Sequence, residues 1–288
     1  MRAFTWRHIA FLGCLLGVPT AAMNAQQTAA EKFSEIAWEK GPAVGSLGNE
    51  ATVRITDGCT FTGVEGTRKF LTLTQNPWSG DERGTALCQI VRQSGDSAQW
   101  FAIFEFDGSG YVKDDEKAEL DADKMLASLR RGNEAANKTR KERGWGTLEL
   151  VGWEKAPFYD PATNNLTWAM RVRADDGGES INHSVRLLGR RGVMKVDLVV
   201  APENYSESLT GFTALIADHE YNSGEKYAEW REGDKIAGYG LTALVAGGAG
   251  VMAAKTGLLS KLWKVIVAGV VALGAAVKKL FGRKTQSA

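Results

Sequence analysis

The chain is poor in the residues from which metal and redox sites are built. Its 288 residues include only three cysteines and three histidines, which argues against a centre made of thiolates and imidazoles. Net charge is also scarce, because 35 Lys and Arg residues are balanced by 34 Asp and Glu residues. A nucleic-acid-binding protein needs a clustered basic surface, so we expect no nucleic-acid partner. We also expect no cofactor and no metal.

A nucleotide site is missing as well, although residues 247–257 (GGAGVMAAKTG) resemble a phosphate-binding loop. Aligning that motif on Lys255 and Thr256 puts Ala249 and Ala254 where two glycines are required. Only glycine lets the backbone amides curl around a phosphate. We therefore expect no nucleotide partner.

No constellation of catalytic residues stands out. The sequence has no Gly-x-Ser-x-Gly nucleophile elbow, and the acidic stretch at 114–123 lacks the central glycine and the residue order of a calcium loop. His183 lies in a strand-like segment, and His219 lies on a helix-like face. We therefore name no catalytic residue, and the sequence does not favour an enzyme.

The N-terminus has the layout of a secretory signal peptide. Arg2 and Arg7 precede an apolar run at 9–18, which is followed by PTAAMNA. The run is too short to span a bilayer. We expect residues 1–25 to be the signal, with cleavage after Ala22 or Ala25. Removal leaves Cys59 and Cys88, which in an oxidising compartment either form a disulfide or remain two buried thiols.

Residues 26–235 read as one α+β domain that is rich in antiparallel strands. Short β-branched or aromatic segments alternate with Gly, Asn and Asp from residue 51 onward, and one of them is FLTLT at 70–74. Residues 186–200 predict a hairpin that turns between Gly189 and Gly192. Two covering helices are predicted, one from Asp121 to Gly132 and one from Ser206 or Ser208 to Gly224. Two similar halves are expected to meet near 143–153.

Residues 236–284 predict a membrane anchor, followed by a short tail at 285–288. Residues 236–254 carry no charge, and residues 258–277 form a second apolar stretch between lysines. A single transmembrane helix and a helical hairpin both remain open. We expect the bilayer as a partner and the inner (cytoplasmic) membrane as the location, with the main domain in the periplasm.

Small residues at four-residue spacing mark the first of these segments as a packing helix. Such spacing lets two helices approach closely in lipid. The residues concerned are Ala243, Ala246, Gly247, Gly250 and Ala254.

Exposed contacts are expected at the predicted hairpin tip. Arg190 and Arg191 form that tip, and Asp114 lies in an acidic turn. Trp153 and Trp168 either fill the core or line a groove for a partner.

Several motifs together resemble one bacterial family. They are GYVKDDE, AANKTRKERGWGTLELVGWEKAPFYDPATNNLTWAM, INHSVRLLGRRGVMKVDLVVA and GEKYAEWREGDKIAGYGLTALVAGG. Over residues 41–284 the chain resembles membrane-anchored proteins of the domain of unknown function 2167 family. The resemblance implies an exported domain with a C-terminal membrane segment, and it brings no known activity. Its motif positions here are Gly110, Tyr111, Asp114, Trp153, Pro157, Trp168, Leu188, Gly189, Arg190, Gly192 and Asp234.

We therefore expect a membrane-anchored envelope protein that works as a binding or assembly factor, with another membrane or periplasmic protein as a further partner. A cell-envelope hydrolase and a regulatory subunit of a membrane complex are the alternatives. A deep cleft holding His183 or His219 beside carboxylates would favour the hydrolase.

Overall fold

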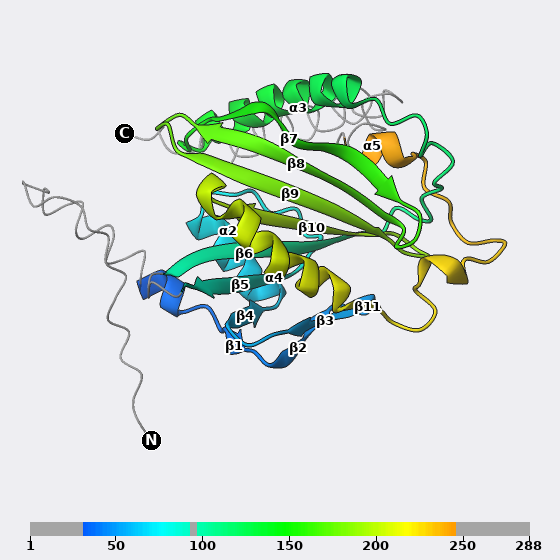
Figure 1. Ribbon diagram of the computed structural model, residues 1–288, viewed down its shortest axis with the longest axis horizontal. Coiled ribbons are helices and arrows are strands. Elements are labelled where there is room, and N and C mark those ends of the chain that lie inside the picture. The colour runs from blue at the N-terminus through cyan, green and yellow to red at the C-terminus, as the bar shows by residue number, and fades with distance from the viewer. Residues whose placement is uncertain (1–30, 93–96, 246–288) are drawn as a thin grey trace, which may run out of the picture.

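The computed structural model describes residues 31–92 and 97–245, and its main element is an antiparallel sheet of eight strands. Their order is β1-β4-β5-β6-β10-β9-β8-β7 (Figure 1). The strands are β1 (Glu39–Lys40), β4 (Cys59–Thr62), β5 (Glu82–Val91), β6 (Ser97–Asp107), β7 (Leu148–Asp160), β8 (Asn165–Ala174), β9 (Glu179–Leu188) and β10 (Val193–Val200). Together with the helices below, they confirm the predicted α+β class.

One face of this sheet is covered by helix α4 and by a small second sheet. Helix α4 (Tyr205–Ala217) follows the short 3₁₀ helix η1 (Pro202–Asn204), and the second sheet joins β2 (Ala43–Leu47), β3 (Ala51–Ile55) and β11 (His219–Tyr221). Alternate residues of the central strands point to this face, because successive side chains of a strand alternate. Phe104, Met194 and Leu198 therefore meet Phe212 and Leu215 of α4 in the larger core.

The opposite face is covered at its two ends. Helix α2 (Val64–Leu73) lies on β4 and β5, where the Phe70 and Phe101 rings are 4.9 Å apart. Helix α3 (Ala122–Glu142) lies along β7, and the short helix α5 (Leu241–Val245) lies beside α3 (Figure 1). A second buried cluster joins Val112, Met125, Leu166, Trp168, Leu188, Val193, Ala237, Leu241, Leu244 and Val245.

Helix α3 starts where the sequence predicts and ends later. The Asp121 carboxylate accepts a hydrogen bond from the backbone N–H of Lys124 at 3.0 Å, as expected of an N-cap. The predicted end at Gly132 is wrong, since the helix runs through this residue to Glu142. An interior glycine costs about 1 kcal/mol. Side chains of α3 offset this cost by binding backbone carbonyls of β7, with Arg130 on Val151 at 2.8 Å and Asn133 on Leu148 at 2.7 Å.

Of four further predictions about secondary structure, three differ from the fold and one is confirmed. FLTLT lies at the end of α2 and the loop after it, not in a strand, because Thr67, Phe70 and Leu71 are buried at helical spacing. The second predicted helix ends at Ala217, after which β11 pairs with β3. The segments on either side of 143–153 form one continuous sheet, in which β6 pairs with β10. The hairpin of β9 and β10 is confirmed.

A strap of residues 222–240 connects β11 to α5 and contains the 3₁₀ helix η2 (Tyr227–Glu229). It is bonded to Tyr111, whose N–H donates to the Lys235 carbonyl at 2.8 Å and whose carbonyl accepts from Ala237 N–H at 2.8 Å. Residues 236–245 open the predicted membrane segment, and here they pack on the second core through Ala237 and α5.

The rest of the predicted anchor, residues 246–284, lies outside the described residues, as does the predicted signal at 1–25. Within 31–92 and 97–245, no helix combines the length and the apolar character needed to cross a bilayer.

Candidate functional site

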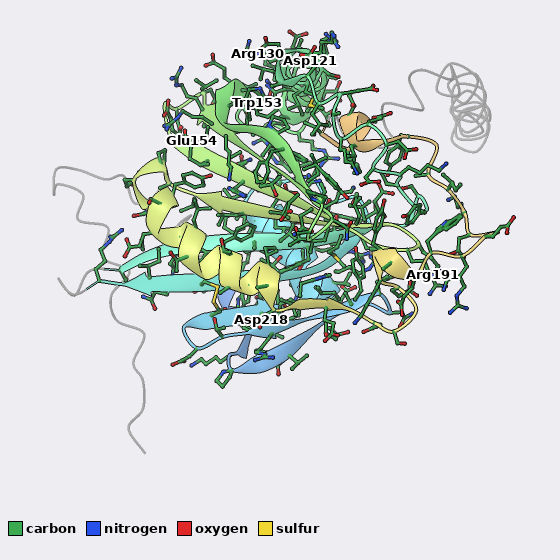
Figure 2. The ribbon with its side chains drawn as sticks, turned by 45° about the vertical axis from the view of Figure 1, so that its right-hand side comes forward. Asp121, Arg130, Trp153, Glu154, Arg191 and Asp218 are labelled. Carbon is green, nitrogen blue, oxygen red and sulfur yellow. A yellow bond between two sulfur atoms is a disulfide. The ribbon has the colours of Figure 1, made fainter. Side chains whose placement is uncertain are left out.

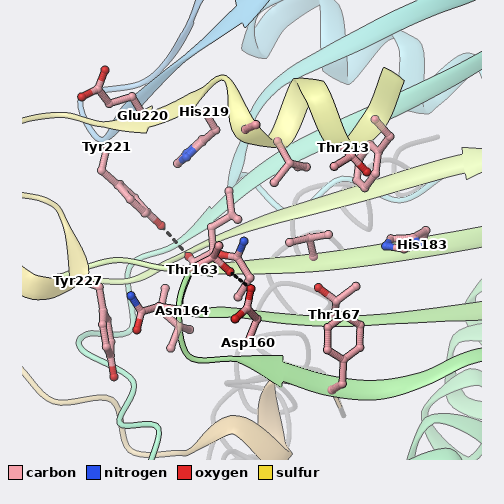
Figure 3. Close-up of a pocket in the computed structure, with 18 of the residues that line it drawn as sticks. Asp160, Thr163, Asn164, Thr167, His183, Thr213, His219, Glu220, Tyr221 and Tyr227 are labelled. Atoms are coloured by element: carbon pink, nitrogen blue, oxygen red, sulfur yellow. Dashed lines mark hydrogen bonds between the residues drawn. The ribbon is translucent and has the colours of Figure 1, made fainter. Parts of the chain in front are cut away.

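A cleft of about 740 Å³ lies between helix α4 and the outer strands β7, β8 and β9. Helix α4 covers the centre of the sheet and leaves the strands β7, β8 and β9 uncovered beside it on the same face. Leu209, Thr213 and Ile216 form the wall on α4, and Phe158 and Thr167 lie on the strands opposite. Figure 3 shows Thr213 on the helix above and Thr167 on the sheet below.

The middle of the cleft is apolar and its ends are polar. Val185 and Leu187 of β9 and Phe212 of α4 provide buried apolar surface. Phe158 is a large apolar side chain with 39% of its surface exposed. Apolar walls with a few polar groups are typical of ligand sites in proteins, so the cleft suits a ligand with an apolar part.

His183 lies at one end of the cleft and is neutral at pH 7. Its Nδ1 is 2.8 Å from the Tyr205 hydroxyl. Burial, with a smaller contribution from Lys155, lowers the pKa of His183 to about 4. The imidazole is therefore held as an uncharged hydrogen-bonding group on the floor of the cleft.

His219 lies at the other end, where it begins β11 (Figure 3). Burial lowers its pKa to about 4 as well. The imidazole packs edge-on against Tyr221 with the ring centroids 4.9 Å apart, and its buried Nε2 has no hydrogen-bond partner among the described residues. Both imidazoles therefore add polarity to the cleft without adding charge.

The carboxylates of the cleft serve local structure. Asp160 accepts from Ala162 N–H at 2.9 Å and from the Thr163 hydroxyl at 2.9 Å, which lowers its pKa. Glu220 pairs with Lys226 at 3.2 Å. Within the part of the chain described, neither imidazole is hydrogen-bonded to a carboxylate. Two histidines and two carboxylates thus share the cleft without forming the linked pairs of an acid–base site.

Arg190, expected to be exposed at the hairpin tip, is largely buried. Its guanidinium makes a two-pronged contact with Asp234, with Nε–Oδ2 at 2.6 Å and Nη2–Oδ1 at 2.7 Å. It also donates to the Gly224 carbonyl at 3.2 Å. The bidentate geometry is strong and directional, so Arg190 fastens the strap to the β9–β10 hairpin. Arg191 remains 65% exposed and pairs with the buried Glu225.

The other predicted contact residues also take part in packing or local bonds. Asp114 pairs with Lys117 at 3.0 Å. Trp153 packs against the second core and donates to the Ala122 carbonyl at 3.1 Å. Trp168 is buried beneath the Arg186 guanidinium, which lies 4.6 Å from the ring centroid. Figure 2 shows Trp153 near the start of α3 and Arg191 at the far end of the molecule.

Arg186 belongs to a second polar group on the sheet, away from the cleft. Its guanidinium is 3.1 Å from Asp197, which also accepts from the Ser184 hydroxyl at 2.5 Å. Lys195 lies 3.9 Å from Glu105, and burial beside Asp197 raises the pKa of Glu105. Each of these charges has an opposite charge beside it, so this group neutralises itself.

Cys59 and Cys88 form a disulfide that joins β4 to β5, where the two residues are direct cross-strand partners. Ala243, one of the predicted helix-packing residues, lies half-buried in α5. The others, Ala246, Gly247, Gly250 and Ala254, lie outside the described residues. Among the residues described, no three His, Cys, Asp or Glu side chains are grouped so that they could hold a metal ion.

Sequence reasoning missed most of the cleft. The apolar face of α4 is readable from Leu209, Phe212 and Ile216, which recur at helical spacing. Thr213 flanks that face and shows no signal of its own. Phe158 comes from strand β7, far from α4 in the sequence, and only the fold brings Phe158 and Thr213 into one cleft.

Comparisons with known proteins show which family the chain belongs to. No curated protein gives a significant match. Among solved structures, the solution structure of cyanobacterial PsbP (CyanoP) from Synechocystis sp. PCC 6803 is similar at 14% identity, covering 64% of this chain and 97% of that chain. Its TM-score of 0.36 is too low to carry an argument. Residues 39–277 match the family model described as "Protein of unknown function (DUF2167)", and the chain belongs to that family.

Proposed function

We propose that this protein is an envelope binding factor that holds an apolar segment of a partner protein in the cleft between α4 and β7–β9. The apolar middle of the cleft carries the proposal, because Phe158, Leu209 and Ile216 offer accessible apolar surface around a cleft that the buried Val185 and Leu187 also line. Neutral His183 and His219 suit a partner held by contact and hydrogen bonds, without a charge to match.

Export and membrane anchoring are part of the same proposal. The sequence of residues 1–25 supports export, and the apolar stretches within 236–284 support an anchor in the inner membrane. A disulfide between Cys59 and Cys88 suits a chain that folds in an oxidising compartment. A tethered periplasmic domain is well placed to meet other envelope proteins.

A photo-cross-linking amino acid at Thr213 tests the proposal in the full chain. Thr213 and Thr210 are both exposed threonines of α4, but only Thr213 lines the cleft. We expect irradiation of cells to join the Thr213 variant to a discrete partner protein, and the Thr210 variant to lack that product. Identical products from both positions, or adducts with phospholipid alone, would contradict a protein-binding cleft.

A cleft-filling substitution gives a second test. Thr213→Trp puts a large ring in the cleft, and Thr210→Trp puts the same ring outside it. We expect the first variant to lose the cross-linked partner when the cross-linker is placed at Ala217, which also lines the cleft. The second variant should keep it. Equal loss in both variants would point to a general effect on α4.

A further inference from the structure

Two exposed side chains of the strap, Trp230 and Ile236, form an apolar surface patch together with the half-buried Tyr111 beside them, and we call these three residues the strap patch. Trp230 is 39% exposed and Ile236 is 46% exposed. The Trp230 ring lies 5.6 Å from the Tyr111 ring, and Ile236 is the β-bridge partner of Tyr111. In Figure 1 the strap leaves the body of the molecule at the right, beyond the ends of β8 and β9.

The strap patch is held rigidly from behind. Tyr227 stacks on Tyr111 with the ring centroids 4.5 Å apart and the planes 13° from parallel. The Tyr227 hydroxyl donates to the Val112 carbonyl at 3.0 Å, and the backbone of Tyr111 is bonded to the strap on both sides. Exposed aromatic side chains that the fold orders in this way lose little freedom on binding, which favours a contact surface.

Charges around the strap patch roughly cancel. Arg231, Lys235 and Lys113 are exposed basic residues, and Glu232 and Asp115 are exposed acidic ones. Asp234 is neutralised by Arg190. A surface that binds anionic lipid by charge needs a basic cluster, so the contacts of this patch must come from its rings and its aliphatic side chain.

The position of the patch in the chain indicates what it meets. From Ile236 the chain runs through Ala237 and α5 on the second core to Val245, and the uncharged residues 246–254 and the apolar stretch 258–277 follow. Tryptophan and tyrosine favour the interface between water and the hydrocarbon of a bilayer, because their rings are apolar and their N–H or O–H is polar.

We propose that the strap patch rests on the phospholipid interface beside the chain's own anchor and so fixes the orientation of the domain on the membrane. This inference rests on the proposed membrane anchoring. The domain would then be attached to the membrane at two points, the anchor and the strap patch. Because Arg190 and Asp234 fasten the strap to the β9–β10 hairpin, the second point would hold the domain as well as the strap. The partner is the lipid surface, recognised through aromatic side chains with little dependence on charge.

Fluorescence quenching in vesicles tests the strap patch. The full chain is reconstituted into vesicles of phosphatidylethanolamine and phosphatidylglycerol, with and without a brominated phosphatidylcholine. We expect Trp230→Phe to lose part of the fluorescence that bromine quenches in the wild type. Trp78→Phe, which removes another exposed tryptophan from the loop after α2, should lose none. Raising the salt concentration should leave the quenched part unchanged.

A second variant protects the test against a folding defect. Ile236→Ser changes an exposed side chain and keeps Trp230, and we expect reduced quenching with an unchanged thermal unfolding temperature. If the chain floats with the vesicles but Trp230→Phe leaves quenching unchanged, the inference is wrong. Emission of Trp230 that depends on protein concentration, without bromine quenching, would assign the patch to a second copy and overturn it too. If the chain does not float, the anchoring itself is wrong and the patch has no bilayer beside it.

Discussion

At the scale of single residues, the Tyr221 hydroxyl joins three parts of the fold. It accepts from Met194 N–H at 2.9 Å and donates to the Leu187 carbonyl at 2.8 Å, so β11 is fastened to both strands of the β9–β10 hairpin. Burial raises the pKa of Tyr221, which keeps the hydroxyl protonated and able to donate.

Replacing Tyr221 by Phe should lower the free energy of unfolding by about 1–3 kcal/mol, the usual cost of leaving buried polar groups unpaired. Chemical denaturation of the full chain measures the loss. Tyr159→Phe is the control, because its half-buried hydroxyl is bonded to the side chains of Asn164, at 3.2 Å, and Asp114, and both side chains can rearrange when the hydroxyl is removed. A loss at Tyr221 no larger than that at Tyr159 would contradict this role.

Asp234 predicts how the strap responds to acid. Hydrogen bonds from the Arg190 side chain and from the backbone N–H of Arg231 lower its pKa to about 2. A carboxylate with a lowered pKa contributes stability above its unfolded pKa, near 4, and loses that contribution as the pH falls through the folded value. We therefore expect the stability difference between wild type and Asp234→Asn to be constant near neutral pH and to shrink between about pH 4 and pH 2.

Thermal unfolding of the two proteins over a pH series measures this difference. His219 provides a contrast, because its pKa is lowered to about 4 from 6.5 and it affects stability at higher pH. As the pH falls from about 6.5 to about 4, the unfolded chain gains a proton on His219 that the folded chain does not take up, so the free energy of unfolding decreases. A difference between wild type and Asp234→Asn that does not change below pH 4 would mean that Asp234 is not the ionised partner of Arg190.

At the scale of elements, Gly110 decides how the strap lies against the sheet. Its φ is +117°, and an added Cβ would lie 2.6 Å from the Lys235 carbonyl oxygen. Gly110→Ala should therefore strain the backbone by about 1–3 kcal/mol and push the strap away. Gly108→Ala is the matched control, since its Cβ would meet only an ordinary contact at 3.8 Å.

Trypsin reports the outcome, because Arg231 and Lys235 lie in the strap. We expect faster cleavage at these two residues in Gly110→Ala than in the wild type or in Gly108→Ala. Equal rates in all three proteins would show that the strap does not depend on the approach at Gly110.

Elements with strong local signals could be predicted from the sequence. The N-cap at Asp121 and the turn between Gly189 and Gly192 each depend on a few neighbouring residues, and the structure contains both. Partners that lie far apart could not be predicted. Nothing near Arg190 reveals Asp234, 44 residues later, as its partner. The cleft could not be predicted for the same reason, because Phe158 and Thr213 on its two walls are far apart in the sequence.

At the scale of the whole molecule, the disulfide and the predicted signal make a joint prediction. The bond between Cys59 and Cys88 spans 29 residues, and in the loop-entropy model closing such a loop stabilises a fold by about 3–4 kcal/mol. Because both cysteines are buried in the fold, the reagent is applied after denaturation, and we expect the thiols of the exported chain to resist alkylation until they are reduced. Deleting residues 2–25 should leave both reactive, because the cytosol keeps thiols reduced.

Denaturation with and without reductant measures the stability, and a maleimide reagent measures the thiols. The double variant Cys59→Ala and Cys88→Ala should match the reduced wild type in stability. Thiols that are equally reactive with and without the predicted signal would contradict export by this segment.

Reporter fusions test the proposed arrangement on the membrane. We expect a periplasmic reporter to be active when fused after Asp234. With one span, the reporter should be active after Gly257 and inactive at Ala288. With a helical hairpin, the pattern at these two sites should reverse. Inactivity after Asp234 would place the domain on the cytoplasmic side and contradict the proposal.

The pairing of β6 with β10 also determines when the molecule can fold. These central strands are about 90 residues apart, and contacts between distant segments form slowly because a long loop must close first. The strands β1, β4, β5 and β6 therefore form a partial sheet whose edge at β6 stays unpaired until β10 is available. A chain that crosses a membrane from its N-terminus exposes the β6 edge for much of its passage. We therefore expect folding of the exported chain to require that this edge be kept from pairing with other chains until β10 has emerged.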